Sequence, residues 1–183
     1  MTDIQNNPVA LIDVQSEENA SGDVAKVYAE MKEAWHMVPN PMKLFSADPA
    51  LLRHRWEGFK IMGENTSVDP MFQTLLRMLV SVTHDCDYCV GLNESMLMGM
   101  FEMTPEQVAA MKKDPATAPL PEKQKALLLF VLKAVKTPKS TTKTEIEALH
   151  TLGWSDADIF FAMNYATDMV ATDILINAFH VER

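Results

Sequence analysis

Residues 70–101 read "PMFQTLLRMLVSVTHDCDYCVGLNESMLMGMF" and contain two apolar stretches joined by a pair of cysteines. In the first stretch the apolar residues recur every three or four positions, which places them on one face of an α-helix. They are Phe72, Leu75, Leu76, Leu79 and Val80. The second stretch, from about residue 85 to residue 101, keeps a helical pattern despite Gly91. These residues therefore predict two consecutive helices with the cysteine pair at their junction.

Helical patterns also cover most of the remaining chain. Capping residues and prolines divide it into helical segments at about residues 22–37, 47–65, 104–114, 122–136, 140–153 and 155–182. No segment alternates with the period of two that a strand requires. We therefore expect an all-α, single-domain bundle of about seven to nine helices over residues 21–183. Residues 1–20 are polar and aperiodic, and we expect a tail or an arm that lies on a neighbour.

Composition and charge narrow the choice of partners and location. The chain has 183 residues, of which 48% are hydrophobic and 22% charged, as in a soluble globular domain. Its net charge of −9 would repel nucleic acid and anionic membrane surfaces. We find no apolar run of about 20 residues and no secretory leader. We therefore expect a cytoplasmic protein without nucleic-acid or membrane partners.

Cys86 and Cys89 are the two cysteines of the chain, and their spacing suits dithiol chemistry. With Asn93 they occupy positions i, i+3 and i+7, which lie on one face of a helix. A helix start favours a thiolate, and a separation of three residues allows a disulfide within one turn. One sulfur can attack a peroxide or a disulfide, and the other can resolve the product.

Two other interpretations of the pair stay open at this point. Free cysteine is among the most buried residue types, so both side chains can be small core residues. Structural zinc takes four ligands. Here His84 is the one histidine near the cysteines, and the sequence offers no second ligand motif. The chain also lacks the Gly-rich turn of a nucleotide site. We therefore expect neither a metal nor a cofactor.

The segment "HDCDYCVGLNES" resembles the alkyl hydroperoxidase D-like (AhpD-like) branch of the carboxymuconolactone decarboxylase superfamily. "NPMKLFSADPALLRHRWEGFKIM" is similar to the lead-in of its peroxidase-related members, and "LGWSDADIFFAMNYATDMVATDILINAF" is similar to their closing helices. The resemblance covers most of the chain after about residue 20. It implies an AhpD-like helical fold and a homo-oligomer, a trimer or a hexamer.

The resemblance also implies a proton relay, and this chain departs from it at two positions. The family pattern has a glutamate where Thr74 stands and a histidine where Asn93 stands. Neither residue exchanges a proton near neutral pH, and losing such a group costs about 10²- to 10⁴-fold in rate. His84 has the pKa range of a proton shuttle, although a solvated histidine at a helix end fits it as well. If Asn93 holds the relay position, Asn93→His should raise turnover.

The resulting expectation is a thiol-dependent, peroxiredoxin-like peroxidase or disulfide reductase of antioxidant type. Its substrate would be a peroxide or disulfide, and an external dithiol would reduce it again. Cys86 and Cys89 would form the dithiol, with Asn93, His84 and Thr74 around it. Exposure at a helix start favours Cys86 as the first nucleophile, whereas the family relay lies nearer Cys89. The alternative is a non-catalytic or weakly active oligomer with a redox-sensitive pair, while lactone decarboxylation is disfavoured because that branch generally lacks the pair.

Overall fold

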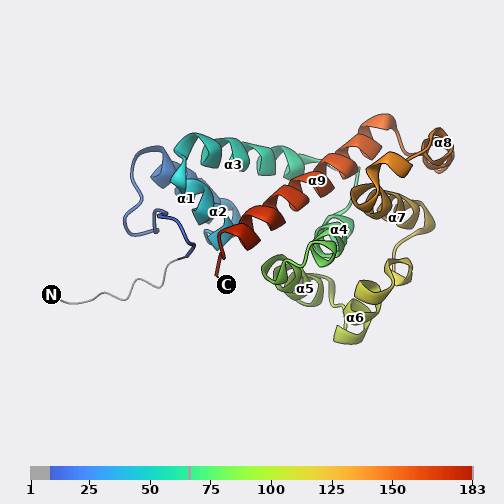
Figure 1. Ribbon diagram of the computed structural model, residues 1–183, viewed down its shortest axis with the longest axis horizontal. Coiled ribbons are helices and arrows are strands. Elements are labelled where there is room, and N and C mark those ends of the chain that lie inside the picture. Colours follow the sequence, from blue (N-terminus) through green and yellow to red (C-terminus); the bar gives the residue numbers. More distant parts are fainter. Residues whose placement is uncertain (1–8, 66, 183) are drawn as a thin grey trace. The chain divides into compact units, whose positions relative to one another are not determined.

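The computed structural model describes residues 9–65 and 67–182, and in these residues it contains nine α-helices, three short 3₁₀ helices and no strand (Figure 1). The predicted all-α class and the predicted number of helices are confirmed. The α-helices are α1 (Gly22–Trp35), α2 (Asn40–Leu44), α3 (Pro49–Glu64), α4 (Pro70–Thr83), α5 (Asp87–Phe101), α6 (Pro105–Lys113), α7 (Glu122–Lys136), α8 (Lys143–Thr151) and α9 (Asp156–Ala178). The 3₁₀ helices are Phe45–Ala47, Pro115–Thr117 and Pro138–Ser140.

Side-chain caps fix where several of these helices begin. Asp48 accepts the backbone N–H groups of the first turn of α3, and Asp69 accepts one from α4. In both helices a proline follows the cap, where its missing N–H is not needed. Thr104 and Thr142 begin α6 and α8 with full capping boxes, each completed by the side chain three residues later. The predicted starts of α3, α4 and α6 are therefore confirmed, whereas α8 begins three residues later than predicted, because Thr142 caps it and Ser140 belongs to a 3₁₀ helix.

The described residues group into two units, and the first comprises residues 9–65 and 175–182. Its core lies mainly on α1 and α3 and includes Val24, Val27, Tyr28, Met31, Leu52 and Trp56. The described part of the N-terminal arm packs within this unit. The Leu11 N–H donates to the Phe179 carbonyl at 2.9 Å, and the Glu182 N–H donates to the Val9 carbonyl at 3.1 Å. The arm therefore contacts the C-terminal end of its own chain, while the predicted domain boundary at residue 20 stays a prediction.

The second unit, residues 67–174, is built around α4. Helix α4 packs against both α5 and α7, so its apolar residues are buried on more than one side. Its buried residues are Phe72, Thr74, Leu75, Leu76, Met78, Leu79, Val80 and Ser81. The first part of α9 also belongs to this unit, and it buries Ile159, Ala162, Tyr165, Ala166, Met169, Thr172 and Asp173.

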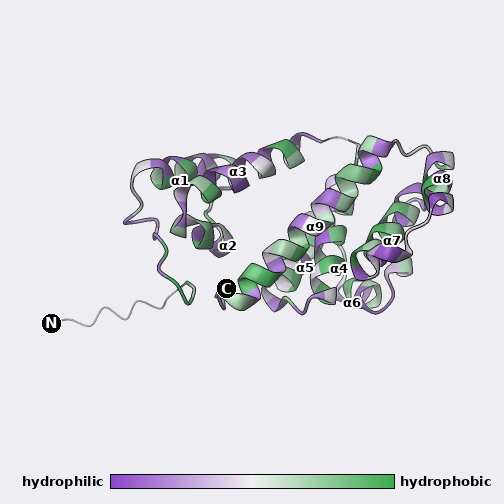
Figure 2. Ribbon diagram, turned by 45° about the horizontal axis from the view of Figure 1, so that its top comes forward, coloured by the Kyte–Doolittle hydropathy of each residue, from purple (hydrophilic) through white to green (hydrophobic). Residues whose placement is uncertain are grey.

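Among the described helices, α9 has the length and apolarity of a membrane-spanning segment, with a mean hydropathy of 1.3 over its most apolar window. Hydrophilic residues interrupt its apolar surface along its whole length (Figure 2). Of that window 44% is buried, and two aspartates, Asp168 and Asp173, lie within the length of the helix. A core helix of a soluble protein has the same properties.

Candidate functional site

The two cysteines lie at the turn between α4 and α5. Asp85 adopts a left-handed conformation, with φ of 50°, and this residue redirects the chain after α4 ends. The Cys86 N–H then donates to the Ser81 carbonyl at 3.1 Å, and the Val90 N–H donates to the Cys86 carbonyl at 2.9 Å. Cys86 is therefore the N-cap residue of α5, and Cys89 lies in its first turn. The predicted position of the pair at a helix start is confirmed.

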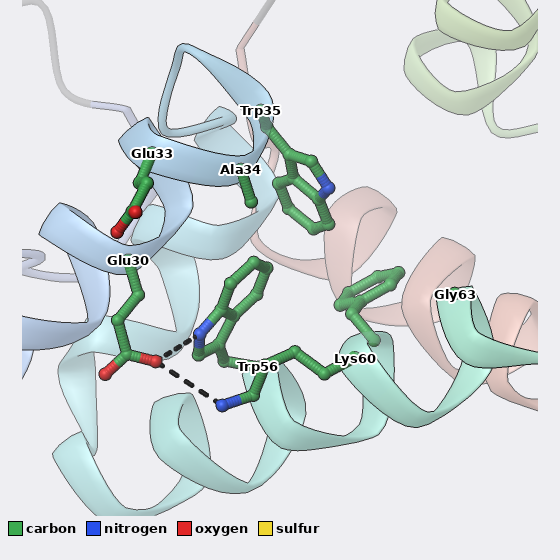
Figure 3. A pocket seen from close by; sticks show the side chains of 8 residues that line it. Glu30, Glu33, Ala34, Trp35, Trp56, Lys60 and Gly63 are labelled. Carbon is green, nitrogen blue, oxygen red and sulfur yellow. Dashed lines mark hydrogen bonds and ion pairs between the residues drawn. The ribbon is translucent and has the colours of Figure 1, made fainter.

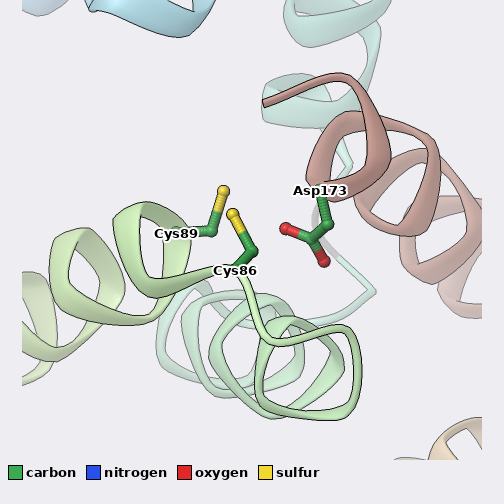
Figure 4. A group of neighbouring side chains, drawn as sticks. All are labelled: Cys86, Cys89 and Asp173. Atoms are coloured by element: carbon green, nitrogen blue, oxygen red, sulfur yellow. The ribbon is translucent and has the colours of Figure 1, made fainter. Parts of the chain in front are cut away.

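Both sulfurs lie beside a carboxylate from α9. The Sγ atoms of Cys86 and Cys89 and a carboxylate oxygen of Asp173 are all within 4.8 Å of one another. The two thiol side chains point the same way from the start of α5, and Asp173 reaches towards them from α9 (Figure 4). Both cysteines are free thiols. The site therefore combines a dithiol with one further ionisable group, Asp173. Neither the cysteine motif nor the family pattern indicates this residue.

All three side chains are buried. Cys86 and Asp173 have no exposed surface, and Cys89 keeps 3%. The sequence-based expectation that Cys86 is exposed at the helix start is therefore wrong. Its physical reason is the packing of α9 against the end of α4, where Ser81 Oγ donates to Asp173 Oδ1 at 2.9 Å. A helix start by itself would leave the Cys86 sulfur accessible to water, and the packing of α9 removes that access.

The carboxylate of Asp173 is only partly satisfied. Its Oδ1 atom accepts the Ser81 hydroxyl, whereas its Oδ2 atom is buried without a hydrogen-bond partner. Burial raises the pKa of Asp173, because the charged form loses hydration. Contacts with the two thiols and with Ser81, and the charge of protonated His84, partly offset this rise in pKa.

The two thiols differ from each other in acidity. The Cys89 S–H donates to the Cys86 sulfur, and this lowers the pKa of Cys86 below that of an ordinary thiol. The same hydrogen bond, together with burial and the negative charge of Asp173, raises the pKa of Cys89 well above its usual range. The arrangement therefore favours a Cys86 thiolate that is stabilised by a Cys89 thiol.

Thr74 and Asn93 are brought together, but around a cation instead of around the sulfurs. Arg77 Nε donates to Asn93 Oδ1 at 2.8 Å, and its Nη2 donates to Thr74 Oγ1 at 3.0 Å. Asn93 Nδ2 donates to the Cys89 carbonyl at 2.8 Å, and Thr74 Oγ1 donates to the Pro70 carbonyl at 2.8 Å. Arg77 also donates to the Tyr165 hydroxyl. These bonds anchor α5 and α9 to α4, and none of them reaches the sulfur of Cys86 or Cys89.

His84 is the C-cap residue of α4, lies two residues before Cys86 and is half-buried. Its backbone N–H donates to the Ser81 carbonyl at 3.2 Å. Its charge lowers the pKa of Asp173, so it lies near enough to influence the site electrostatically. The role of His84 as a proton donor stays a prediction.

A metal ion would find three ligand atoms at this place. Within the described ranges, the group of potential ligands comprises Cys86, Cys89 and Asp173, and no fourth side chain belongs to it. Structural zinc sites have four protein ligands, so the donor set is one short. The residues present fit a dithiol with a carboxylate better than a structural metal centre.

The sequence reading missed Asp173 and Arg77. Each stands alone as a charge inside an apolar helical face, Arg77 in "TLLRMLV" and Asp173 in "MVATDILINAF". A charge is almost never fully buried unless it has a partner or a function. That signal was available in the sequence, but only the fold shows that Asp173 meets the cysteines.

A separate pocket lies in the first unit, between α1 and α3. Its volume is about 480 Å³, and it is lined by Glu30, Glu33, Ala34, Trp35, Trp56, Phe59, Lys60 and Gly63 (Figure 3). Glu30 Oε2 accepts the Trp56 indole N–H at 2.7 Å and the Lys60 ammonium at 3.5 Å. None of the predicted site residues lines this pocket.

No family model and no curated protein matches the sequence. Solved structures do match. A peroxidase-related protein from Ralstonia eutropha JMP134, described as an alkylhydroperoxidase AhpD core, aligns over 96% of this chain and 93% of its own, with a TM-score of 0.82 and 19% identity. A peroxidase-related protein from Silicibacter sp. TM1040 aligns over 99% and 95%, with a TM-score of 0.83 and 17% identity.

The debrominase Bmp8 aligns over 97% of this chain and 92% of its own, with a TM-score of 0.74 and 15% identity. A cysteine-to-alanine variant of Bmp8 has been solved with 2,3,4-tribromopyrrole. At such identities the likeness establishes the fold and not the activity. The chain has the AhpD-like fold, and the resemblance seen in the sequence is confirmed at that level.

Proposed function

We propose that the chain is a dithiol oxidoreductase of antioxidant type that reduces small peroxides with Cys86 and Cys89. The observation that carries the proposal is the contact group itself: two thiols and a carboxylate within 4.8 Å of one another. The peroxidase-related proteins of the same fold support it. The absence of relay groups at Thr74 and Asn93 predicts a slow enzyme unless another residue moves the protons.

The difference in acidity assigns the order of the two cysteines. The Cys86 thiolate attacks the terminal oxygen of the hydroperoxide, so that an S–O bond forms and the O–O bond breaks. The leaving alkoxide takes up a proton and departs as an alcohol, or as water from hydrogen peroxide. The Cys89 sulfur then attacks the Cys86 sulfur, an S–S bond forms, and the hydroxyl leaves with a proton as water. The two thiols lose two electrons and the peroxide gains them.

The buried sulfurs restrict the oxidant. With Cys86 fully covered, a reagent must be small or must wait for local opening of the α4–α5 turn. We therefore expect hydrogen peroxide to react faster than a bulky hydroperoxide such as cumene hydroperoxide. An external dithiol would reduce the disulfide again, and a reducing cytoplasm is the compartment that would supply it.

The experiment follows stoichiometric oxidation of the reduced chain by one equivalent of hydrogen peroxide. The native chain should lose both thiols and two hydrogen atoms in intact mass. Cys89→Ser should stop at a Cys86 sulfenic acid, with one added oxygen that dimedone traps, and Cys86→Ser should show no dimedone adduct. Ser95→Ala, on an exposed part of α5, is the matched control. A native chain that keeps both thiols under these conditions would contradict the proposal.

Burial also favours a second candidate function, a redox-sensitive structural disulfide (a staple) without catalytic turnover. In that case the disulfide would form once and would not be recycled. Repeated peroxide consumption with excess dithiothreitol separates the two candidates, because a staple consumes one equivalent and an enzyme consumes many. Because Bmp8 shares the fold, 2,3,4-tribromopyrrole is a useful additional oxidant in the same assay.

A further inference from the structure

Asp173 is an ionisable group in the dithiol site for which the family pattern has no role. Its carboxylate is fully buried, and one of its oxygens points towards the sulfurs in Figure 4. Its Oδ2 atom has no hydrogen-bond partner, although a buried acceptor of this kind normally has one. A buried carboxylate with one oxygen still free to accept, beside two groups that must lose protons, is placed to receive them.

We propose that Asp173 accepts and returns the protons of the dithiol, and so replaces the relay that Thr74 and Asn93 do not provide. The inference rests on the proposed function and adds a proton-transfer group to it. Ser81 fixes the carboxylate through a hydrogen bond to Oδ1, so the carboxylate is held in place beside the two thiols. General acid–base help from a positioned side chain contributes typically about 10²- to 10⁴-fold.

Asp173 transfers two protons in one cycle, one from each thiol. Asp173 first takes the proton of the Cys86 thiol and gives it to the alkoxide that leaves when the O–O bond breaks. It next takes the proton of the Cys89 thiol as that sulfur attacks Cys86, and gives it to the departing hydroxyl, which leaves as water. After both steps Asp173 is ionised again, and the two thiol protons are in the alcohol and the water.

Several groups face Asp173 and set the pH dependence. They are Ser81 on α4, His84 at the turn, and Cys86 and Cys89 at the start of α5. The proton acceptor has to be ionised, so the oxidation rate should rise with pH through the pKa of Asp173. Burial raises that pKa, so the acidic limb of the profile should lie at higher pH than an ordinary aspartate would give.

A fixed negative charge would have the opposite effect on the rate. The charge of Asp173 raises the pKa of both cysteines, so removing it should increase the fraction of thiolate. If the charge were the whole role of Asp173, Asp173→Asn would therefore react faster than the native chain. If Asp173 transfers protons, the same variant reacts more slowly despite its more acidic thiols. The two roles predict changes of opposite sign.

The test measures disulfide formation by hydrogen peroxide in single turnover across pH, together with alkylation of the thiols by iodoacetamide. Asp173→Asn should form the disulfide about 10²- to 10⁴-fold more slowly, with alkylation at least as fast as in the native chain. Asp168→Asn, on the same helix, should match the native chain. An Asp173→Asn rate equal to or above the native rate overturns the inference and leaves the proposed function standing. A native chain that forms no disulfide overturns both.

Ser81→Ala provides a second variant that keeps the carboxylate, should Asp173→Asn fail to fold. The Ser81 hydroxyl lowers the pKa of Asp173, so its loss should move the acidic limb of the rate profile to higher pH. An acidic limb that stays at the native position would overturn the inference.

Discussion

At the scale of single residues, the burial of the Asp173 carboxylate is energetically unfavourable. Its pKa is raised in the folded chain, so the stability that its protonated form contributes is fully present below the ordinary pKa of an aspartate. That contribution is lost as pH rises through the raised pKa. Above the raised pKa the ionised side chain therefore destabilises the fold relative to a neutral one.

Asp173→Asn should accordingly raise the melting temperature at neutral pH. Each unit of raised pKa corresponds to about 1.4 kcal/mol, and each kcal/mol to about 2–4 °C in a chain of this size. The difference should vanish when calorimetry is repeated below the ordinary pKa of an aspartate. A variant that melts lower than the native chain at neutral pH would contradict the buried charge.

Asn93 is the residue for which the structure reverses the expected effect of a substitution. Its amide is engaged by Arg77 on one side and by the Cys89 carbonyl on the other. A histidine there would remove the amide oxygen that accepts Arg77 Nε. Leaving a fully buried donor unsatisfied costs about 1–3 kcal/mol, and Arg77 is partly buried, so we expect the lower end of that range. We expect Asn93→His to lower both urea stability and turnover, and a gain in turnover would show that the relay position is usable.

At the scale of elements, the α4–α5 turn sets the position of both sulfurs. Asp85 holds the left-handed conformation that directs Cys86 to the start of α5. Glycine adopts this conformation without strain, whereas a β-branched residue does not. Asp85→Gly should therefore keep the urea midpoint close to native, and Asp85→Val should lower stability by about 1–2 kcal/mol. Equal losses in both variants would mean that a side-chain contact of Asp85, and not its backbone, decides the effect.

Much of this level was predictable from the sequence. The spacing of apolar residues and caps such as Asp69 and Thr104 predict the helices, because these signals act within one or two turns. The burial of Cys86 and the approach of Asp173 were not predictable. They depend on α9 packing against α4 across some 90 residues, as the Ser81–Asp173 bond shows with its separation of 92 positions. Local patterns carry no information about that contact.

At the scale of the whole molecule, the predicted homo-oligomer stays a prediction that α9 supports. Phe160, Thr167 and Ile174 recur every seven residues on this helix and are exposed, Phe160 by 72% and Ile174 by 56%. The two exposed apolar side chains of this row, Phe160 and Ile174, are what a second helix would cover.

Light scattering on the native chain should therefore give a mass above that of one protomer, and Phe160→Glu should reduce it. Because Phe160 is exposed, the substitution should leave the helical circular dichroism of each protomer unchanged. Leu11→Glu, at an exposed position outside α9, is the matched control. A native mass equal to one protomer would contradict the oligomer, and an unchanged mass in Phe160→Glu would exclude this face.

The enclosure of the two sulfurs also bears on how the protein behaves at the bench. Ellman's reagent is a bulky aromatic disulfide, so on the native chain it should register almost no free sulfhydryl within minutes. In guanidinium chloride the same sample should register both. A low count before denaturation would thus be mistaken for an oxidised preparation, although the dithiol is intact and merely shielded.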